Sequence, residues 1–256
     1  MCHETAARPP LPPIEGGAGA ASSRRVILEA ADGNRLRAFS ATAIDPEAPG
    51  VVILPDVRGL HPFYEQLAVR FAEAGVHATA LDYFGRTAGI DDRSEDFDFT
   101  PHRKRMTSEG TAADIAAAVA YVRSDAGGDA QRVFTVGFCM GGRLSFNQAA
   151  DRDDLEGVMG FYGAPHVGGP DDARAPISLA PGYRCPVLGL FGGADEGIPV
   201  EALDRFRETL NEGGVPNEIV VYEGAPHSFF DRSFEEYREA CDDAWRRVLG
   251  FVRGSG

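Results

Sequence analysis

The fold is decided by residues 133–142, which read Val133-Phe-Thr-Val-Gly137-Phe-Cys139-Met-Gly141-Gly142. A short β-branched and aromatic run ends in a glycine-rich turn, and a helix-compatible segment, residues 143–150, follows. This order of strand, sharp turn and helix is typical of a nucleophile elbow, here with cysteine where serine is usual. The residues two before and two after a nucleophile approach each other closely, and Gly137 and Gly141 meet that need. The pattern predicts that Cys139 is a nucleophile.

Cys139 has two interpretations at this point. The turn places it at a helix N-terminus, where unpaired N–H groups and the helix dipole favour the thiolate. The alternative is a buried structural cysteine beside a glycine turn, because unpaired cysteine is among the most buried residue types. A dinucleotide site fits poorly, since residues 137–142 do not match G-x-G-x-x-G.

The composition is that of a globular protein, with 43% hydrophobic and 25% charged residues among 256. A net charge of −14 argues against nucleic acid and anionic membranes as partners, because both are polyanions. The chain has no membrane-length apolar run and no signal-peptide pattern, so we expect a cytoplasmic protein. Its four cysteines, at positions 2, 139, 185 and 241, have neither metal-site nor disulfide-framework spacing.

Two regions are expected along the chain. Residues 1–23 are rich in proline and glycine and predict a flexible tail, and residues 24–256 predict a single domain. Residues 25–30 and 36–43 are strand-like runs separated by Asp32-Gly33-Asn34, a strong hairpin signal.

Strands and helices then alternate to the end of the chain, which predicts one doubly wound, mostly parallel sheet with an antiparallel hairpin at its N-terminal edge. The Gly/Pro-rich segment 165–182 is expected to be a loop, and the basic cluster at 102–105 within the polar segment 87–108 is expected to be a solvated loop or a helix turn. The expected strands are 51–54, 76–81, 133–138, 157–163, 186–191 and 218–222, and the expected helices are 63–74, 109–123, 143–150, 200–210 and 234–252.

The partners that a cysteine nucleophile needs follow later strands. A base must take the thiol proton and an acid must orient that base. The order Cys139, Asp195, His227 is the nucleophile–acid–histidine order of elbow-containing hydrolases, and each partner follows its own predicted strand. The backbone N–H groups of Met140 and Val57 are the predicted donors to the oxyanion.

Three motifs carry a family resemblance: Gly-Phe-Cys-Met-Gly-Gly at 137–142, Gly-Gly-Ala-Asp at 192–195 and Ala-Pro-His-Ser-Phe-Phe-Asp-Arg at 225–232. Together they resemble the dienelactone hydrolase (carboxymethylenebutenolidase) family over about residues 25–252. The resemblance implies an α/β-hydrolase fold and a Cys-His-Asp triad that acts on a small lactone or ester without a cofactor. It also implies attack by Cys139, departure of a substrate-derived enolate, and release of the acid by water assisted by His227.

The chain departs from the family pattern at two positions. The family glutamate that engages the resting thiol corresponds to Asp56, which is one methylene shorter. The family arginine four positions after the histidine corresponds to Asp231, with Arg232 next to it. Arg58 and Arg86 are alternatives for an anionic group, or else structural. The candidate thiol-modulating and substrate-contacting residues are therefore Asp56, Arg58, Tyr83, Arg86, Tyr162 and Arg232, the two tyrosines being equally compatible with plain core packing.

The sequence therefore predicts a hydrolase of a small lactone or activated ester that works through an acyl-enzyme on Cys139. Two alternatives remain: a hydrolase of another ester or thioester, and a redox-sensing thiol on a hydrolase scaffold. The expected partner is a small-molecule substrate, with no metal, and the expected state is a monomer or homodimer.

Overall fold

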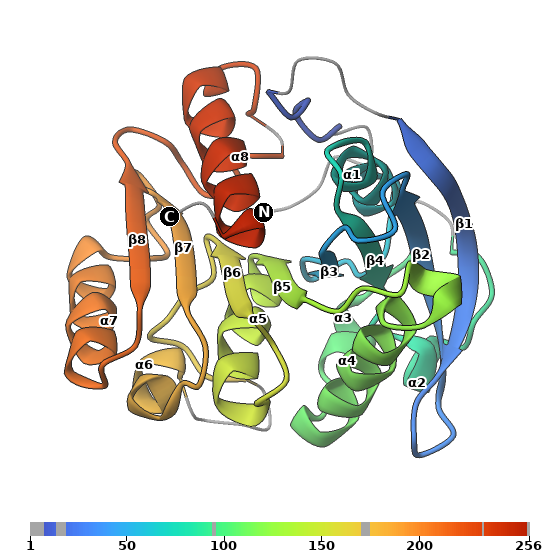
Figure 1. The fold of residues 1–256 in the computed structure, drawn as a ribbon. Coiled ribbons are helices and arrows are strands. Elements are labelled where there is room, and N and C mark those ends of the chain that lie inside the picture. Colours follow the sequence, from blue (N-terminus) through green and yellow to red (C-terminus); the bar gives the residue numbers. More distant parts are fainter. Residues whose placement is uncertain (1–7, 14–18, 94–95, 170–174, 232, 255–256) are drawn as a thin grey trace.

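A computed structural model describes residues 8–13, 19–93, 96–169, 175–231 and 233–254 (Figure 1). Within them, eight strands form one sheet in the order β1-β2-β4-β3-β5-β6-β7-β8. β2 runs antiparallel to both β1 and β4, and every other neighbouring pair is parallel. The strands are β1 (Ala20–Glu29), β2 (Arg35–Ala43), β3 (Gly50–Leu54), β4 (His77–Leu81), β5 (Val133–Phe138), β6 (Gly157–Phe161), β7 (Val187–Gly192) and β8 (Asn217–Tyr222).

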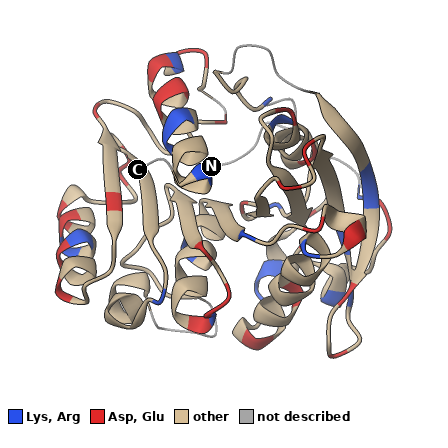
Figure 2. Ribbon diagram, in the orientation of Figure 1, with Lys and Arg blue, Asp and Glu red and all other residues tan. Residues whose placement is uncertain are grey.

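The five central strands, β3 to β7, are buried along their whole length. None of them contains Asp, Glu, Lys or Arg, and Figure 2 shows the charged residues on the outer helices, the edge strands and the loops instead. This composition is expected of parallel strands that helices cover on both faces.

Helices cover both faces of the sheet (Figure 1). α1 and α8 lie on one face, and α4, α5 and the adjoining α6 and α7 lie on the other. The helices are α1 (Pro62–Glu73), α2 (Gly85–Ala88), α3 (Thr100–Arg103), α4 (Ser108–Val122), α5 (Met140–Asp151), α6 (Pro176–Leu179), α7 (Val200–Glu212) and α8 (Arg238–Arg253), with 3-10 turns at Asp125–Gly127 and Ala180–Gly182. The architecture confirms the predicted α/β class, the mostly parallel sheet and the antiparallel N-terminal pair.

Some predicted boundaries are wrong. The segment 165–182, expected to be a loop, contains α6 and a 3-10 turn, whereas α3 within 87–108 agrees with the helix turn allowed at 102–105. The last helix begins at Arg238 and not at 234, because residues 233–237 form turns. Local polarity and apolar spacing cannot distinguish a turn from the first turn of a helix.

The predicted N-terminal tail also differs from the structure where it is described. β1 begins at Ala20, inside the segment expected to be flexible. Pro9, Pro10 and Pro12 are buried, and the indole N–H of Trp245 donates to the carbonyl of Pro10 at 3.1 Å. A buried tryptophan needs an acceptor for its N–H, and the proline segment supplies one. Residues 1–7 and 14–18 of the predicted tail lie outside the described residues.

Candidate active site

The elbow forms as its sequence predicts. β5 ends at Phe138, α5 begins at Met140, and Cys139 between them has φ 55° and ψ −114°. A side-chain carbon on Gly137 would lie 1.9 Å from the carbonyl oxygen of Gly141, a distance that excludes every residue but glycine. Positive φ is costly for cysteine, and residues held in such backbone conformations cluster at active sites.

Asp195 and His227 come together at the carboxyl ends of β7 and β8. The Nδ1 atom of His227 lies 2.6 Å from Oδ2 of Asp195. Because an ionised carboxylate only accepts hydrogen bonds, Nδ1 carries the proton and Nε2 is left as the basic nitrogen. The other carboxylate oxygen accepts the N–H of Gly197 at 3.0 Å, so both oxygens are held. The Asp195 side chain is 4% exposed and that of His227 is 30% exposed, which leaves the imidazole accessible to a substrate.

Tyr162 connects the elbow to the histidine. The N–H of Cys139 donates to the carbonyl of Phe161 at 3.0 Å, and Tyr162 is the next residue. Its ring centroid lies 4.9 Å from that of His227 and 6.2 Å from that of Phe138. The elbow and His227 therefore both border Tyr162, the first residue after β6. Tyr162 is buried, with its ring packed between Phe138 of the elbow strand and His227.

Backbone strain marks a further residue that the sequence did not single out. Among the described non-glycine residues, only Asp129, Cys139, Tyr162 and Ser228 have positive φ, and the last three all border this site. Ser228 has φ 61° and is fully buried directly after His227. In the sequence, only its position within the motif at 225–232 indicated that Ser228 lies near the site.

The loop after β3 lies against the elbow. A side-chain carbon on Gly141 would lie 2.0 Å from the carbonyl oxygen of Leu54 and 2.3 Å from that of Pro55. The hydroxyl of Tyr83, buried at the end of β4, donates to the same Pro55 carbonyl at 2.9 Å. This contact fixes the loop that carries Val57 beside the first turn of α5. Burial raises the pKa of Tyr83 well above its ordinary value, so the hydroxyl stays protonated as a donor.

Asp56 is buried and engaged by its neighbours. Its carboxylate accepts the backbone N–H of Arg58 at 2.8 Å and the Nη2 of the same residue at 2.7 Å. The Nε2 of His61 lies 3.8 Å from Oδ2, which is an ion-pair distance but too long for a hydrogen bond. Burial alone raises the pKa of Asp56, but His61 and Arg58 outweigh it and hold that pKa well below its ordinary value. Asp56 is therefore a carboxylate at neutral pH.

The model of the protein family described as "Dienelactone hydrolase family" matches residues 36–255 of the chain. The chain belongs to this family. A "Putative carboxymethylenebutenolidase" of Salmonella typhimurium is 31% identical over 213 residues, which cover 81% of this chain and 77% of the relative. A protein of the same name from Methylorubrum extorquens is 29% identical over 213 residues, covering 81% and 72%.

Solved structures agree with this assignment. The crystal structure of a "Putative Dienelactone Hydrolase" from Klebsiella pneumoniae superposes with a TM-score of 0.73 at 28% identity, covering 91% of this chain and 99% of that chain. The family resemblance and the α/β-hydrolase fold predicted from the sequence are thus confirmed. The protein is a hydrolase of the carboxymethylenebutenolidase-like type.

The two arginines considered for an anionic group lie in different surroundings. Arg58 is 11% exposed and is paired with Asp56. Arg86 binds Asp32 in the β1–β2 turn and the buried Asp114 of α4, at 2.5 and 2.8 Å. Two carboxylates thus hold its guanidinium, so we leave Arg86 out of the proposed site. Arg232 lies outside the described residues.

The other described cysteines differ from Cys139. Cys185 and Cys241 are buried, and burial raises the pKa of the first to about 11 and of the second to about 12. Both remain thiols at neutral pH, whereas Cys139 is partly exposed. In the part of the chain that the structure describes, no group of His, Cys, Asp or Glu side chains is arranged to hold a metal ion. None of the described helices combines the length and apolar character that crossing a membrane requires.

Proposed function

We propose that this family member hydrolyses a small lactone or activated ester through a thioester on Cys139, with His227 as the base and Asp195 as its orienting acid. The observation that carries the proposal is the 2.6 Å contact between Asp195 and His227 beside an elbow with cysteine at its apex. That contact sets the tautomer that a base requires.

The reaction proceeds in two balanced steps. The sulfur of Cys139 attacks the carbonyl carbon while its proton passes to Nε2 of His227, and the resulting tetrahedral intermediate collapses to a thioester. The C–O bond breaks, and the leaving oxygen takes the proton from His227. A water molecule then gives a proton to the same nitrogen and attacks the thioester. Cleavage of the C–S bond releases the acid and restores the thiol.

The developing oxyanion needs donors on the elbow side of the carbonyl. The N–H of Met140, the first residue of α5, is the elbow's own proposed donor. The N–H of Val57 is the second proposed donor, since its loop lies against Gly141. Each such donor typically contributes a factor of about 10² to 10³ in kcat.

The test is hydrolysis of p-nitrophenyl acetate by the wild type and by Cys139→Ala, with Cys185→Ala as the matched control. We expect the first variant to lose essentially all turnover and the second to keep it. Rapid acid quenching followed by peptide mass spectrometry should find the acetyl group on Cys139. Fully reduced wild-type protein without esterase activity, or Cys139→Ala with unchanged turnover, would show the proposal to be wrong and would favour the redox-sensing alternative.

A further inference from the structure

A pocket of about 550 Å³ is lined by Arg58 and His61, the two residues that contact Asp56. One wall is the loop from Arg58 to Pro62, which continues from the proposed oxyanion donor, and the opposite wall runs from Asp96 to Thr100. Arg37 of β2 also lines it, and its neighbour Ala38 pairs with Leu81 at the carboxyl end of β4. The pocket therefore lies at the carboxyl ends of the strands, where ligands bind in this architecture. Its volume suits a small molecule.

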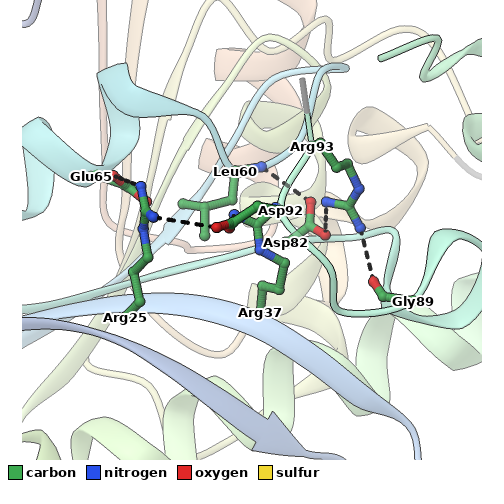
Figure 3. Close-up of polar contacts among 8 residues, drawn as sticks. All are labelled: Arg25, Arg37, Leu60, Glu65, Asp82, Gly89, Asp92 and Arg93. Carbon is green, nitrogen blue, oxygen red and sulfur yellow. Dashed lines mark hydrogen bonds and ion pairs between the residues drawn. The ribbon is translucent and has the colours of Figure 1, made fainter. Parts of the chain in front are cut away.

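The pocket walls are held together by Asp82, as Figure 3 shows. Asp82 is fully buried, and its Oδ1 accepts the N–H of Leu60 at 3.2 Å. Its Oδ2 binds the guanidinium of Arg93, which also donates to the carbonyl of Gly89 at 3.1 Å. The same guanidinium lies 4.8 Å above the ring of Phe97 in the second wall. One buried carboxylate thus ties both walls to the end of β4, so the pocket is preformed.

The sheet order decides which part of an ester reaches this pocket. His227 must protonate the leaving oxygen, so the leaving group lies on the β7–β8 side of Cys139. The pocket lies on the opposite side, along β3, β4 and β2. With the oxyanion directed at the elbow donors, the remaining substituent of the tetrahedral carbon is the acyl group. The acyl group therefore points toward the pocket.

The charges around the pocket are already balanced. Arg25 binds Glu65 at 2.8 Å and Asp92 at 3.7 Å, and Arg37 binds Asp92 at 2.9 Å (Figure 3). The remaining lining arginines, Arg58 and Arg93, are held by Asp56 and Asp82 as described above. Asp96 and Asp98 add negative charge at the rim, so the described lining holds four carboxylates and four arginines. A carboxylate on the acyl group would meet repulsion there, since each guanidinium already has a partner.

Among the described residues, His61 makes no hydrogen bond through either ring nitrogen, although its Nε2 lies at ion-pair distance from Asp56. It lines the pocket with a side chain that is 12% exposed. An unpaired buried polar group is costly, so a ligand atom that bonds to it is favoured. The apolar part of the lining consists of Leu60, Pro62, Phe97 and Phe99.

We propose that this acyl pocket binds an uncharged aromatic acyl group that carries one hydroxyl or carbonyl substituent, and that His61 hydrogen-bonds to that substituent. The inference rests on the proposed function, because it assumes an acyl-enzyme on Cys139. It adds the substrate class: neutral aryl-substituted esters are preferred over esters whose acyl group carries a carboxylate.

The test compares kcat/KM for four p-nitrophenyl esters with one leaving group: acetyl, 3-phenylpropanoyl, 3-(4-hydroxyphenyl)propanoyl and glutaryl. We expect the phenylpropanoyl ester to exceed the acetyl ester by at least about tenfold, as filling an apolar pocket does. The hydroxyl should add a further factor of about five or more. The glutaryl ester should be no better than the acetyl ester. A glutaryl ester that outperforms the phenylpropanoyl ester would overturn the proposal.

Two variants localise the effect, with Phe251→Ala as the matched control. Phe251 is half-buried against Phe134, near the start of β5. It therefore lies at the amino ends of the strands, away from the carboxyl ends where the pocket lies. Phe99→Ala should lower the phenylpropanoyl-to-acetyl ratio at least about fivefold, and His61→Phe should remove the preference for the hydroxyl. If Phe99→Ala melts early, Phe99→Leu replaces it.

The outcomes separate the two proposals. Wild-type ratios in folded Phe99→Ala or Phe99→Leu and in His61→Phe refute the acyl pocket alone, provided that the acetyl ester is still hydrolysed through Cys139. Absence of any acylated Cys139 refutes the proposed function itself.

Discussion

Replacing Asp195 with asparagine tests whether the carboxylate sets the tautomer of His227. The two oxygens of Asp195 are held differently: Oδ2 by Nδ1 of His227 at 2.6 Å, and Oδ1 by the N–H of Gly197 at 3.0 Å. An asparagine has one oxygen and one NH₂ group for these two positions. If its oxygen stays with the Gly197 N–H, its NH₂ faces Nδ1 and forces the proton onto Nε2. Nε2 then cannot take the proton of Cys139.

The magnitude follows from the alternative rotamer of that asparagine. Turning its oxygen to His227 restores the correct tautomer but sets the NH₂ against the N–H of Gly197, and an unsatisfied donor costs about 1–3 kcal/mol. The fraction of variant molecules whose asparagine oxygen faces His227, and which are therefore active, is thus reduced by roughly 5- to 150-fold. Loss of the negative charge also removes about 1 kcal/mol of electrostatic stabilisation of the imidazolium that His227 becomes when it takes the proton. We therefore expect Asp195→Asn to lower kcat by roughly 30- to 800-fold.

Steady-state hydrolysis of p-nitrophenyl acetate measures the effect, with thermal melting as the check on folding. Asp204→Asn is the matched control, because Asp204 makes an exposed ion pair with Arg207 on α7 and should leave kcat unchanged. A folded Asp195→Asn variant whose kcat stays within about threefold of the wild type would refute the tautomer argument.

Three further predictions follow from buried contacts. Gly141→Ala should abolish turnover and lower the melting temperature, since its side-chain carbon meets backbone oxygen of β3, whereas Gly182→Ala has open space and should do neither. Iodoacetamide should alkylate Cys139 in the native protein and Cys241 only after unfolding, as peptide mass spectrometry can show, because burial raises the pKa of Cys241 to about 12. Asp56→Asn should cost about 3 kcal/mol at pH 7. Because the pKa of Asp56 is lowered by folding, this stabilisation is present above the ordinary carboxyl pKa and is lost as the pH falls below it, so urea unfolding of variant and wild type should converge in acid.

The central sheet could be predicted because its strands must be apolar on both faces. Runs such as Val51–Leu54 and Val133–Phe138 are buried throughout, and little but a helix-covered strand fits such a run. The edges were less predictable. β1 is largely exposed over its first residues, and its start at Ala20 depends on pairing with β2 and not on its own composition.

The positions of the candidate triad residues had a local signal in the sequence. Cys139 directly follows β5, Asp195 lies three residues after β7 and His227 lies five residues after β8, so the strand order brings all three to one edge of the sheet. The acyl pocket has no such signal. It depends on Asp82 joining Leu60 to Arg93, which lie 33 residues apart, and on arginine–carboxylate pairs that no spacing in the sequence indicates.

The orientation of Asp56 bears on which group takes the thiol proton. In relatives with a glutamate here, the resemblance implies that this carboxylate engages the resting thiol. Here the shorter side chain accepts the backbone N–H, Nε and Nη2 of Arg58, and its lowered pKa makes it a weak base. His227, with Nε2 left basic by Asp195, is the remaining strand-end group suited to the task. With His227 as the base, activation of Cys139 leaves the Arg58–Asp56 pair intact. The same Arg58–Asp56 pair thus accounts for both the choice of base and the charge balance of the acyl pocket.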